Sequence, residues 1–575
     1  MADPSPPKPD PDRQPRLTDR IAAWRAGFSR PASGFVSQPE PRSIGMVARG
    51  RQLVAGNLLL GGVLVEAPGK SLWQAAPADP GFVDAAHGFA WLDDLAAAGD
   101  LAARTTAQAW VFDWIAAYGT GKGPGWTPDL TGRRLIRWIN HALMLLAGRD
   151  KPESDAFFAA LTRQTVYLSR RWKSAAPGLA RFEALTGLVC AALALEGLDA
   201  LVDPALEALA RDCRSEVDAE GGIPTRNPED LLEVFTLLTW AALALTEAGR
   251  KPPPDLAQAI ERVAPTLRAL RHSDGGLARF HGGGRGLEGR LDHALAQSGV
   301  KPMAVTGLAM GFARLATGRT SVIVDAKAPP QGRASAAAHA STLALELTSG
   351  RRPVIVSCGS GAPFGPEWRR AGRATASHST LAIDGYSSSR LGGGDRLTDR
   401  AQAIPARLSG GVEGQSLLVG HTGWALTHGL THMRGLDLSP DGRALMGQDT
   451  LGAFSGAERK RFDAVMSATR LQGVAFSIRF HLHPEVDAQI DLGGTAVSLG
   501  LRSGEVWVFR HDGTAGLTLE PSVYLEKGRL KPRATKQIVL SARVVDYACE
   551  VGWTLAKAQD TPLAIRDLER DEPPV

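Results

Sequence analysis

Residues 338–347 read Ala338-His339-Ala340-Ser341-Thr342-Leu343-Ala344-Leu345-Glu346-Leu347, and residues 373–385 read Arg373-Ala374-Thr375-Ala376-Ser377-His378-Ser379-Thr380-Leu381-Ala382-Ile383-Asp384-Gly385. In each segment a histidine stands just ahead of residues that alternate between the two faces of an extended chain. Alternation with a period of two predicts β-strands, which hold side chains rigidly enough to line a cleft shared with another domain. The two segments therefore predict a pair of strand starts that carry His339 and His378 into one site.

The same alternation continues through most of the chain after residue 320. Residues 477–484 and 505–510 are clear cases, and turns such as Ser439-Pro440-Asp441-Gly442 separate the strands. Before residue 320 the apolar residues follow helical spacing instead. That spacing predicts helices over 153–176, 199–217, 229–249, 255–273 and 288–316. A run of helices followed by a run of strands indicates two domains, the second an antiparallel sandwich.

Four parts follow from this reading. Residues 1–45 are rich in proline and predict a disordered arm, and residues 46–83 predict a short segment of strand and loop. Residues 84–319 predict an α/α toroid made of helical hairpins with short connections. Residues 320–575 predict the antiparallel β-sandwich.

Composition excludes several classes of protein. The chain has 575 residues, of which 44% are hydrophobic, so it is long enough for two or more cores. The 65 basic and 60 acidic residues give a formal charge of only +5, which an ordinary solvated surface explains. The apolar run at 53–67 is shorter than the roughly 18 residues of a membrane span and predicts a strand pair. No nucleic-acid motif is present, so we expect no nucleic-acid partner.

Residues 351–359 read Arg351-Arg352-Pro353-Val354-Ile355-Val356-Ser357-Cys358-Gly359 and lie between the two histidine segments. Together the three segments resemble the core signature of the heparinase II/III family of polysaccharide lyases. The resemblance implies an incomplete (α/α) toroid followed by a C-terminal antiparallel β-sandwich, with the active cleft between them. It also implies an acidic, uronic-acid-containing polysaccharide as the partner, cleaved by β-elimination.

β-Elimination needs a base that removes the proton next to the carboxylate, a group that neutralises the carboxylate, and an acid that protonates the leaving oxygen. The resemblance implies that His378, His339 and Asp230 occupy the catalytic positions. Arginines in the motif loops are the candidates to bind carboxylates or sulfates: Arg226, Arg279 and Arg373. His339 and His378 are also the implied ligands of a divalent metal such as zinc.

This sequence departs from the family pattern at several of those positions. Ala337 stands where the family carries another histidine, and Ser341 stands at the nearby acidic position. Ser357 replaces the metal-binding aspartate, and Asp230 occupies the position of the catalytic tyrosine. Two imidazoles without the carboxylate make a weak zinc site.

Three functions are therefore left open. The first is a polysaccharide lyase, in active or degenerate form, and the second is a non-catalytic glycan-binding or envelope-associated protein on the same fold. The third is a glycoside hydrolase that uses toroid carboxylates such as Asp230 and Glu220 at a separation of roughly 5–9 Å. A half-buried structural histidine remains the alternative for His339. Arg479, His481 and His483 project from one face of their strand, where the two histidines could bind a metal, and an ordinary exposed polar face is the alternative.

Compartment and assembly are open as well. The N-terminus lacks a basic start followed by an apolar stretch, so it predicts no signal peptide and favours the cytoplasm. The resemblance instead implies the periplasm. A homodimer is the candidate assembly.

Overall fold

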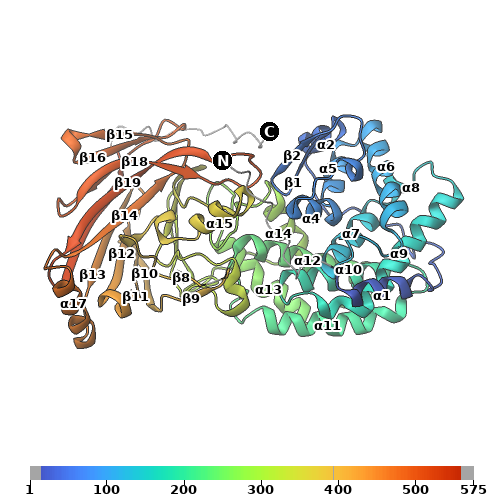
Figure 1. Ribbon diagram of the computed structural model, residues 1–575, viewed down its shortest axis with the longest axis horizontal. Helices are drawn as coiled ribbons and strands as arrows, with labels where there is room; N and C mark the ends of the chain where they lie inside the picture. Colours follow the sequence, from blue (N-terminus) through green and yellow to red (C-terminus); the bar gives the residue numbers. More distant parts are fainter. Residues whose placement is uncertain (1–14, 393, 559–575) are drawn as a thin grey trace.

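A run of helices followed by a run of strands builds the molecule, as the change of period predicts (Figure 1). The computed structural model describes residues 15–392 and 394–558. The N-terminal half is an incomplete α/α toroid and the C-terminal half an antiparallel β-sandwich, so the predicted fold class is confirmed. None of the helices within the described ranges combines the length and the apolarity that a bilayer crossing requires.

The toroid is built from helices around an aromatic-rich core, and α10 (Leu179–Ala194) makes its main contacts with α7 (Pro128–Asn140) and α12 (Pro228–Glu247). Gly132 of α7 and Gly187 of α10 show how close two helices come, since a Cβ built on Gly187 would lie 2.4 Å from the Cα of Gly132. The helices are α1 (Leu17–Ala26), α2 (Val47–Val54), α3 (Leu72–Ala75), α4 (Pro80–Gly88), α5 (Trp91–Ala98), α6 (Leu101–Tyr118), α7 (Pro128–Asn140), α8 (Ala142–Leu146), α9 (Lys151–Arg171), α10 (Leu179–Ala194), α11 (Val202–Glu216), α12 (Pro228–Glu247), α13 (Pro254–Ala269) and α14 (Arg290–Ser298).

The sandwich has two large antiparallel sheets that bury a second core between them. One sheet has the order β10-β11-β12-β13-β20-β17-β16-β15, and the other has the order β18-β19-β14-β6-β5-β4-β3, with β7 paired to β14. The strands are β3 (Phe312–Thr317), β4 (Thr320–Asp325), β5 (Leu345–Ser349), β6 (Arg352–Val356), β7 (Leu381–Ile383), β10 (Ala403–Gly411), β11 (Gly414–Trp424), β12 (Leu430–Leu438), β13 (Ala444–Gly452), β14 (Val474–Leu482), β15 (Asp487–Asp491), β16 (Ala496–Gly500), β17 (Val506–His511), β18 (Gly516–Tyr524), β19 (Arg533–Val544) and β20 (Ala548–Lys557).

Two predicted segments differ from the structure. The helix predicted over 288–316 ends at Ser298, because Gly299 adopts the left-handed conformation and Pro302 follows it. β3 then begins at Phe312 and pairs with β4, so the sandwich starts before residue 320. The arm predicted over 1–45 contains a helix, α1, although residues 1–14 lie outside the described residues. α1 is held against α9 by buried alanines and by an ion pair between Asp19 and Arg171 (2.6 Å).

The segment predicted to contain a short strand pair does contain one. β1 (Asn57–Leu60) and β2 (Val63–Glu66) form an antiparallel hairpin at the face of the toroid that meets the sandwich (Figure 1). The two histidine segments form strands later than predicted, since β5 begins at Leu345 and β7 at Leu381. His339 and His378 therefore lie in irregular backbone just ahead of the strands.

Candidate functional site

A buried ion pair joins the toroid to the sandwich next to these histidines. Arg226, which precedes α12, donates from Nη2 to Oδ1 of Asp325 at the end of β4 (2.6 Å). Its remaining donors reach main-chain oxygens of Met310 (3.0 Å) and Ala328 (2.8 Å). Burial alone would raise the pKa of Asp325, but Arg226 and His281 together hold that pKa well below its usual range. The pair is thus an ionised clamp between the domains.

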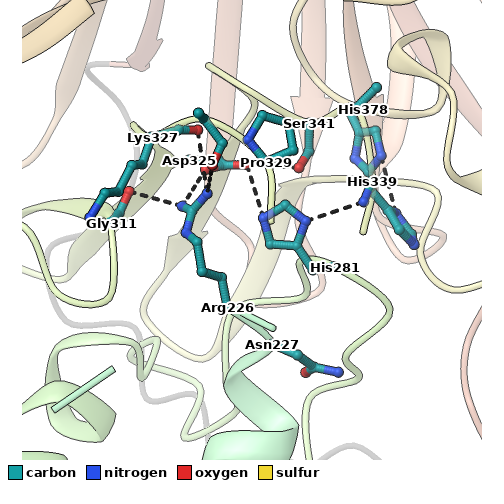
Figure 2. A network of polar contacts seen from close by, with 12 residues as sticks. Arg226, Asn227, His281, Gly311, Asp325, Lys327, Pro329, His339, Ser341 and His378 are labelled. Carbon is teal, nitrogen blue, oxygen red and sulfur yellow. Dashed lines mark hydrogen bonds and ion pairs between the residues drawn. The ribbon is translucent and has the colours of Figure 1, made fainter. Parts of the chain in front are cut away.

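The second oxygen of Asp325 continues the network toward the histidines (Figure 2). Oδ2 accepts a hydrogen bond from Ser341 Oγ (2.8 Å) and lies 3.4 Å from Nε2 of His281. On its other side, Nδ1 of His281 accepts the main-chain N–H of His339 (3.2 Å). The His281 ring is fully buried, so it orders the loop that carries His339.

His339 and His378 face one another at the end of this network. Nδ1 of His339 lies 3.3 Å from Nε2 of His378, and Nδ1 of His378 lies 3.0 Å from Ser357 Oγ. Only 4% of His339 and 0% of His378 are exposed. Burial, followed by the effect of His481, lowers the pKa of His378 to about 3, and burial lowers that of His339 well below its ordinary value. Both imidazoles are neutral at pH 7.

These residues do not fit a zinc ion. Zinc in proteins takes three or four side-chain ligands. Within the described residues no group of three or more His, Cys, Asp or Glu side chains is arranged to hold a metal. Ser357 occupies the position implied for the carboxylate, and Asp325 is already bound to Arg226 and Ser341. The pair of histidines therefore has no third ligand.

Asp230 lies in the first turn of α12. Among the described residues, no hydrogen bond or ion pair links it to His281, His339 or His378. Burial, together with Glu229, raises its pKa to about 6, although Lys527 acts in the opposite direction. Glu229 beside it accepts from Lys527 Nζ (2.5 Å) and from the main-chain N–H of Gly284 (2.8 Å). Glu220, the other proposed hydrolytic carboxylate, is exposed in the turn before α12. The structure thus does not bring Asp230 together with His339 and His378.

The three predicted arginines have different environments. Arg226 forms the interdomain clamp, and Arg373 donates to the main-chain oxygens of Ala338 (2.7 Å) and Ser335 (2.8 Å). Arg279 alone among the three lines a cavity, where its Nη1 donates to the hydroxyl of Tyr524. All three side chains are buried, and Arg279 also lies 3.7 Å from Glu346. Arg226 and Arg373 are structural groups, whereas Arg279 borders the cavity.

That cavity has a volume of about 840 Å³ and lies between the β1–β2 hairpin and loop 283–288 on one side and the sandwich on the other. Its charged lining is mainly basic: Arg49, Arg279, Arg285, Arg352, Arg502, Lys527, Arg529 and Arg533 against Glu229, Asp274, Glu288, Glu485 and Glu526. Neither His339 nor His378 belongs to the lining. The histidine pair thus lies behind the cavity wall, since a Cβ built on Gly282, next to the lining residue Gly283, would come 4.0 Å from Nε2 of His339.

A shared carboxylate leaves positive charge on the sandwich side of the cavity. Glu526 lies between two arginines, Arg529 at 3.4 Å and Arg533 at 3.3 Å. The one carboxylate neutralises only one of these two guanidinium groups, so this part of the wall can bind carboxylate or sulfate groups of a ligand. Glu485 lies nearby, 3.5 Å from Arg352 and 3.3 Å from Arg502.

Sequence reasoning missed most of this wall. The sequence pattern offers His483 only as a metal ligand or as part of an exposed polar face. In the structure His483 is buried, its Nδ1 accepts the N–H of Glu485 (3.3 Å) and its ring packs against Tyr524. His481, on the same face of β14, instead contacts Ser522 (2.8 Å) and the main-chain oxygen of Ala376 (3.0 Å). Polar residues at strand ends were the available signal, but only the folded sandwich brings them together.

Comparison with known proteins identifies the family. A sequence model described as "Heparinase II/III-like, C-terminal" matches residues 300–554. FtsZ-localized protein C of Caulobacter vibrioides is 31% identical over 540 residues, which cover 92% of this chain and 91% of that protein. The chain belongs to the heparinase II/III-like family.

Solved structures agree with the fold of this family. A crystal structure of heparinase III has a TM-score of 0.66 at 12% identity and covers 94% of this chain and 89% of that one. A mutant of the heparan sulfate lyase HepC from Pedobacter heparinus has a TM-score of 0.58 at 13% identity, covering 95% and 88% of the two chains. At such low identity these likenesses show the fold of the family and nothing about this chain's chemistry.

Proposed function

We propose that this protein binds an acidic polysaccharide in the basic cavity and does not cleave it by β-elimination. The observation that carries the proposal is the closed environment of His339 and His378, whose facing nitrogens contact each other and Ser357. A general base must reach the proton that it removes, at about 3 Å or through one water. Neither ring belongs to the cavity lining, so we expect neither of them to contact a polymer bound there.

The cavity has the features that acidic polymer binding requires. Arginines bind carboxylate and sulfate groups through paired N–H donors, and several of them converge here from separate segments. Tyr524 adds a hydroxyl, and His483 is a neutral ring because burial lowers its pKa well below the ordinary value. A uronic-acid chain bound along this wall would present its carboxylates to fixed positive groups.

Binding of fluorescently labelled heparin, a sulfated polymer that contains uronic acids, tests the proposal. Arg502→Glu combined with Arg533→Glu reverses charge at two positions of the wall, and we expect affinity to fall at least about tenfold. The matched control combines Arg407→Glu and Arg510→Glu, which are exposed elsewhere on the sandwich. Equal losses in the two double variants, or no binding by the wild type, would contradict a cavity site.

A second function is supported by the full-length relative. We propose that this protein also associates with FtsZ, because 31% identity extends over 92% of the chain and the relative is named as FtsZ-localized. Co-sedimentation of the purified protein with assembled FtsZ tests this directly. If the protein stays in the supernatant, it does not associate with FtsZ. That result would not bear on polysaccharide binding, which the heparin assay tests separately.

A further inference from the structure

One face of α1 exposes an unusual row of large apolar side chains. Leu17, Ile21, Trp24 and Phe28 are 73%, 43%, 62% and 74% exposed. The spacing of four, three and four residues places all of them on one side of a helix and its continuation. The opposite side consists of small residues that pack toward α9: Ala22, Ala23 and Ala26. α1 thus turns its larger apolar face to solvent and its small residues toward α9. The helix lies in the part of the toroid away from the sandwich (Figure 1).

The charges beside this row have one sign. Every charged residue of 16–30 other than Asp19 is an exposed arginine: Arg16, Arg20, Arg25 and Arg30. Asp19 is 3% exposed and points inward to Arg171 (2.6 Å). On a helical projection Arg20 and Arg25 flank the apolar row on its two sides. The outer surface of this segment therefore combines apolar side chains with positive charge alone.

We propose that this face of α1, defined by Leu17, Ile21, Trp24 and Phe28, binds an anionic lipid surface. A helix that lies in the plane of a membrane interface buries its apolar face among the acyl chains and places arginines at the headgroup phosphates. Tryptophan is favoured at that depth because its ring is apolar and its N–H is polar. The proposal goes beyond polysaccharide binding, since the cavity and α1 are built from different residues.

The choice of a lipid surface rests on the shape and the charge of this face. A convex helix with a row of protruding side chains suits a deformable surface, and the flanking arginines add attraction only to an anionic one. A second copy of the chain would bring the same arginines into apposition, and like charges oppose such a contact. The anionic bilayer is therefore the occupant that this face matches.

Flotation of the full chain with vesicles tests the proposal. One set of vesicles is phosphatidylcholine and the other an equal mixture of phosphatidylcholine and phosphatidylglycerol. We expect the wild type to float with the mixture only, and Ile21→Glu with Trp24→Glu to lower the bound fraction at least about tenfold. The control combines Val412→Glu and Leu426→Glu, whose side chains are 95% and 85% exposed on the sandwich. We expect this control to bind as the wild type does.

Each other result overturns the proposal. Undiminished flotation of the α1 variant, or equal loss in the control, would assign binding to another surface. Absence of wild-type flotation would exclude a lipid partner. If light scattering then showed a wild-type dimer that Ile21→Glu with Trp24→Glu dissociates, the face would belong to a second copy. Thermal unfolding of all variants checks that these exposed substitutions leave the fold intact.

Discussion

Nδ1 of His339 lies 3.3 Å from Nε2 of His378, inside a network that ends at a charged pair between the domains. Both histidines come from the motif segments that first indicate the family, yet the structure surrounds them with protein. The two histidines thus help to organise the domain junction. We therefore expect substitutions at these two positions to lower the stability of the fold.

His378→Ala is expected to destabilise the protein by about 2–4 kcal/mol, because it leaves a cavity and removes the partner of Ser357 and His339. Urea denaturation measures the change. His511→Ala is the control, since His511 lies at the partly exposed end of β17, and it should cost less than about 1 kcal/mol. A small effect of His378→Ala would mean that the ring is not integral to the core.

Arg226→Ala is expected to cost about 3–5 kcal/mol, because Asp325 would remain as a buried, uncompensated charge. A double-mutant cycle with Asp325→Asn should show strong coupling, since each side chain is the other's charge partner. The comparison is Arg250→Ala, which removes an exposed ion pair with Asp203 and should cost at most about 1 kcal/mol. Additive effects of Arg226→Ala and Asp325→Asn would argue against the clamp.

Asp230→Asn is expected to stabilise the protein in a pH-dependent way. The folded-state pKa of Asp230 is about 6, above its ordinary 3.8, so the native state retains a proton that the unfolded chain releases. Native stability therefore declines as the pH rises from about 4 to about 6 and stays lowered above that range. The variant should gain about 2 kcal/mol at pH 7 and almost nothing near pH 4. A gain that is equal at both pH values would contradict the raised pKa.

We expect zinc to have no specific effect on the thermal stability of the protein. Two imidazoles with no third ligand bind zinc weakly, so neither added zinc nor a chelator should shift the melting temperature by more than about 1 °C. The measurement is differential scanning fluorimetry of the wild type beside a His339→Ala and His378→Ala variant. Zinc stabilisation that disappears in the double variant would contradict the assignment of this pair as metal-free.

Local sequence patterns were sufficient to predict the order of the domains. The change from helical to strand periodicity needs only neighbouring residues, and Asn227-Pro228 marks the start of α12, where Asn227 Oδ1 accepts from the N–H of Glu229 (2.9 Å). The helix α1 was missed for the opposite reason. Its stability comes from alanines packed against α9 and from Arg171, which is 152 residues away from Asp19.

The site was harder to predict because its contacts are long-range. Arg226 lies in a loop that suggests substrate binding, and only the partner 99 residues away, Asp325, makes it a structural group. The walls of the cavity likewise come from the β1–β2 hairpin, loop 283–288 and five separate parts of the sandwich, at residues 352–353, 359–360, 483–485, 502 and 524–533. Family resemblance pointed to the correct junction of domains, whereas only the folded structure separates His339 and His378 from the residues that line the cavity.

The central claim is that the protein binds an acidic polysaccharide without cleaving it, and the most direct test measures binding and elimination in the same sample. The protein is mixed with a panel of acidic polysaccharides, and the ultraviolet absorbance of an unsaturated uronate product is followed while anisotropy reports binding. We expect binding of at least one polymer with no rise in absorbance. A rise that His378→Ala abolishes, in protein that remains folded, would contradict this claim and establish an active lyase with His378 in its site.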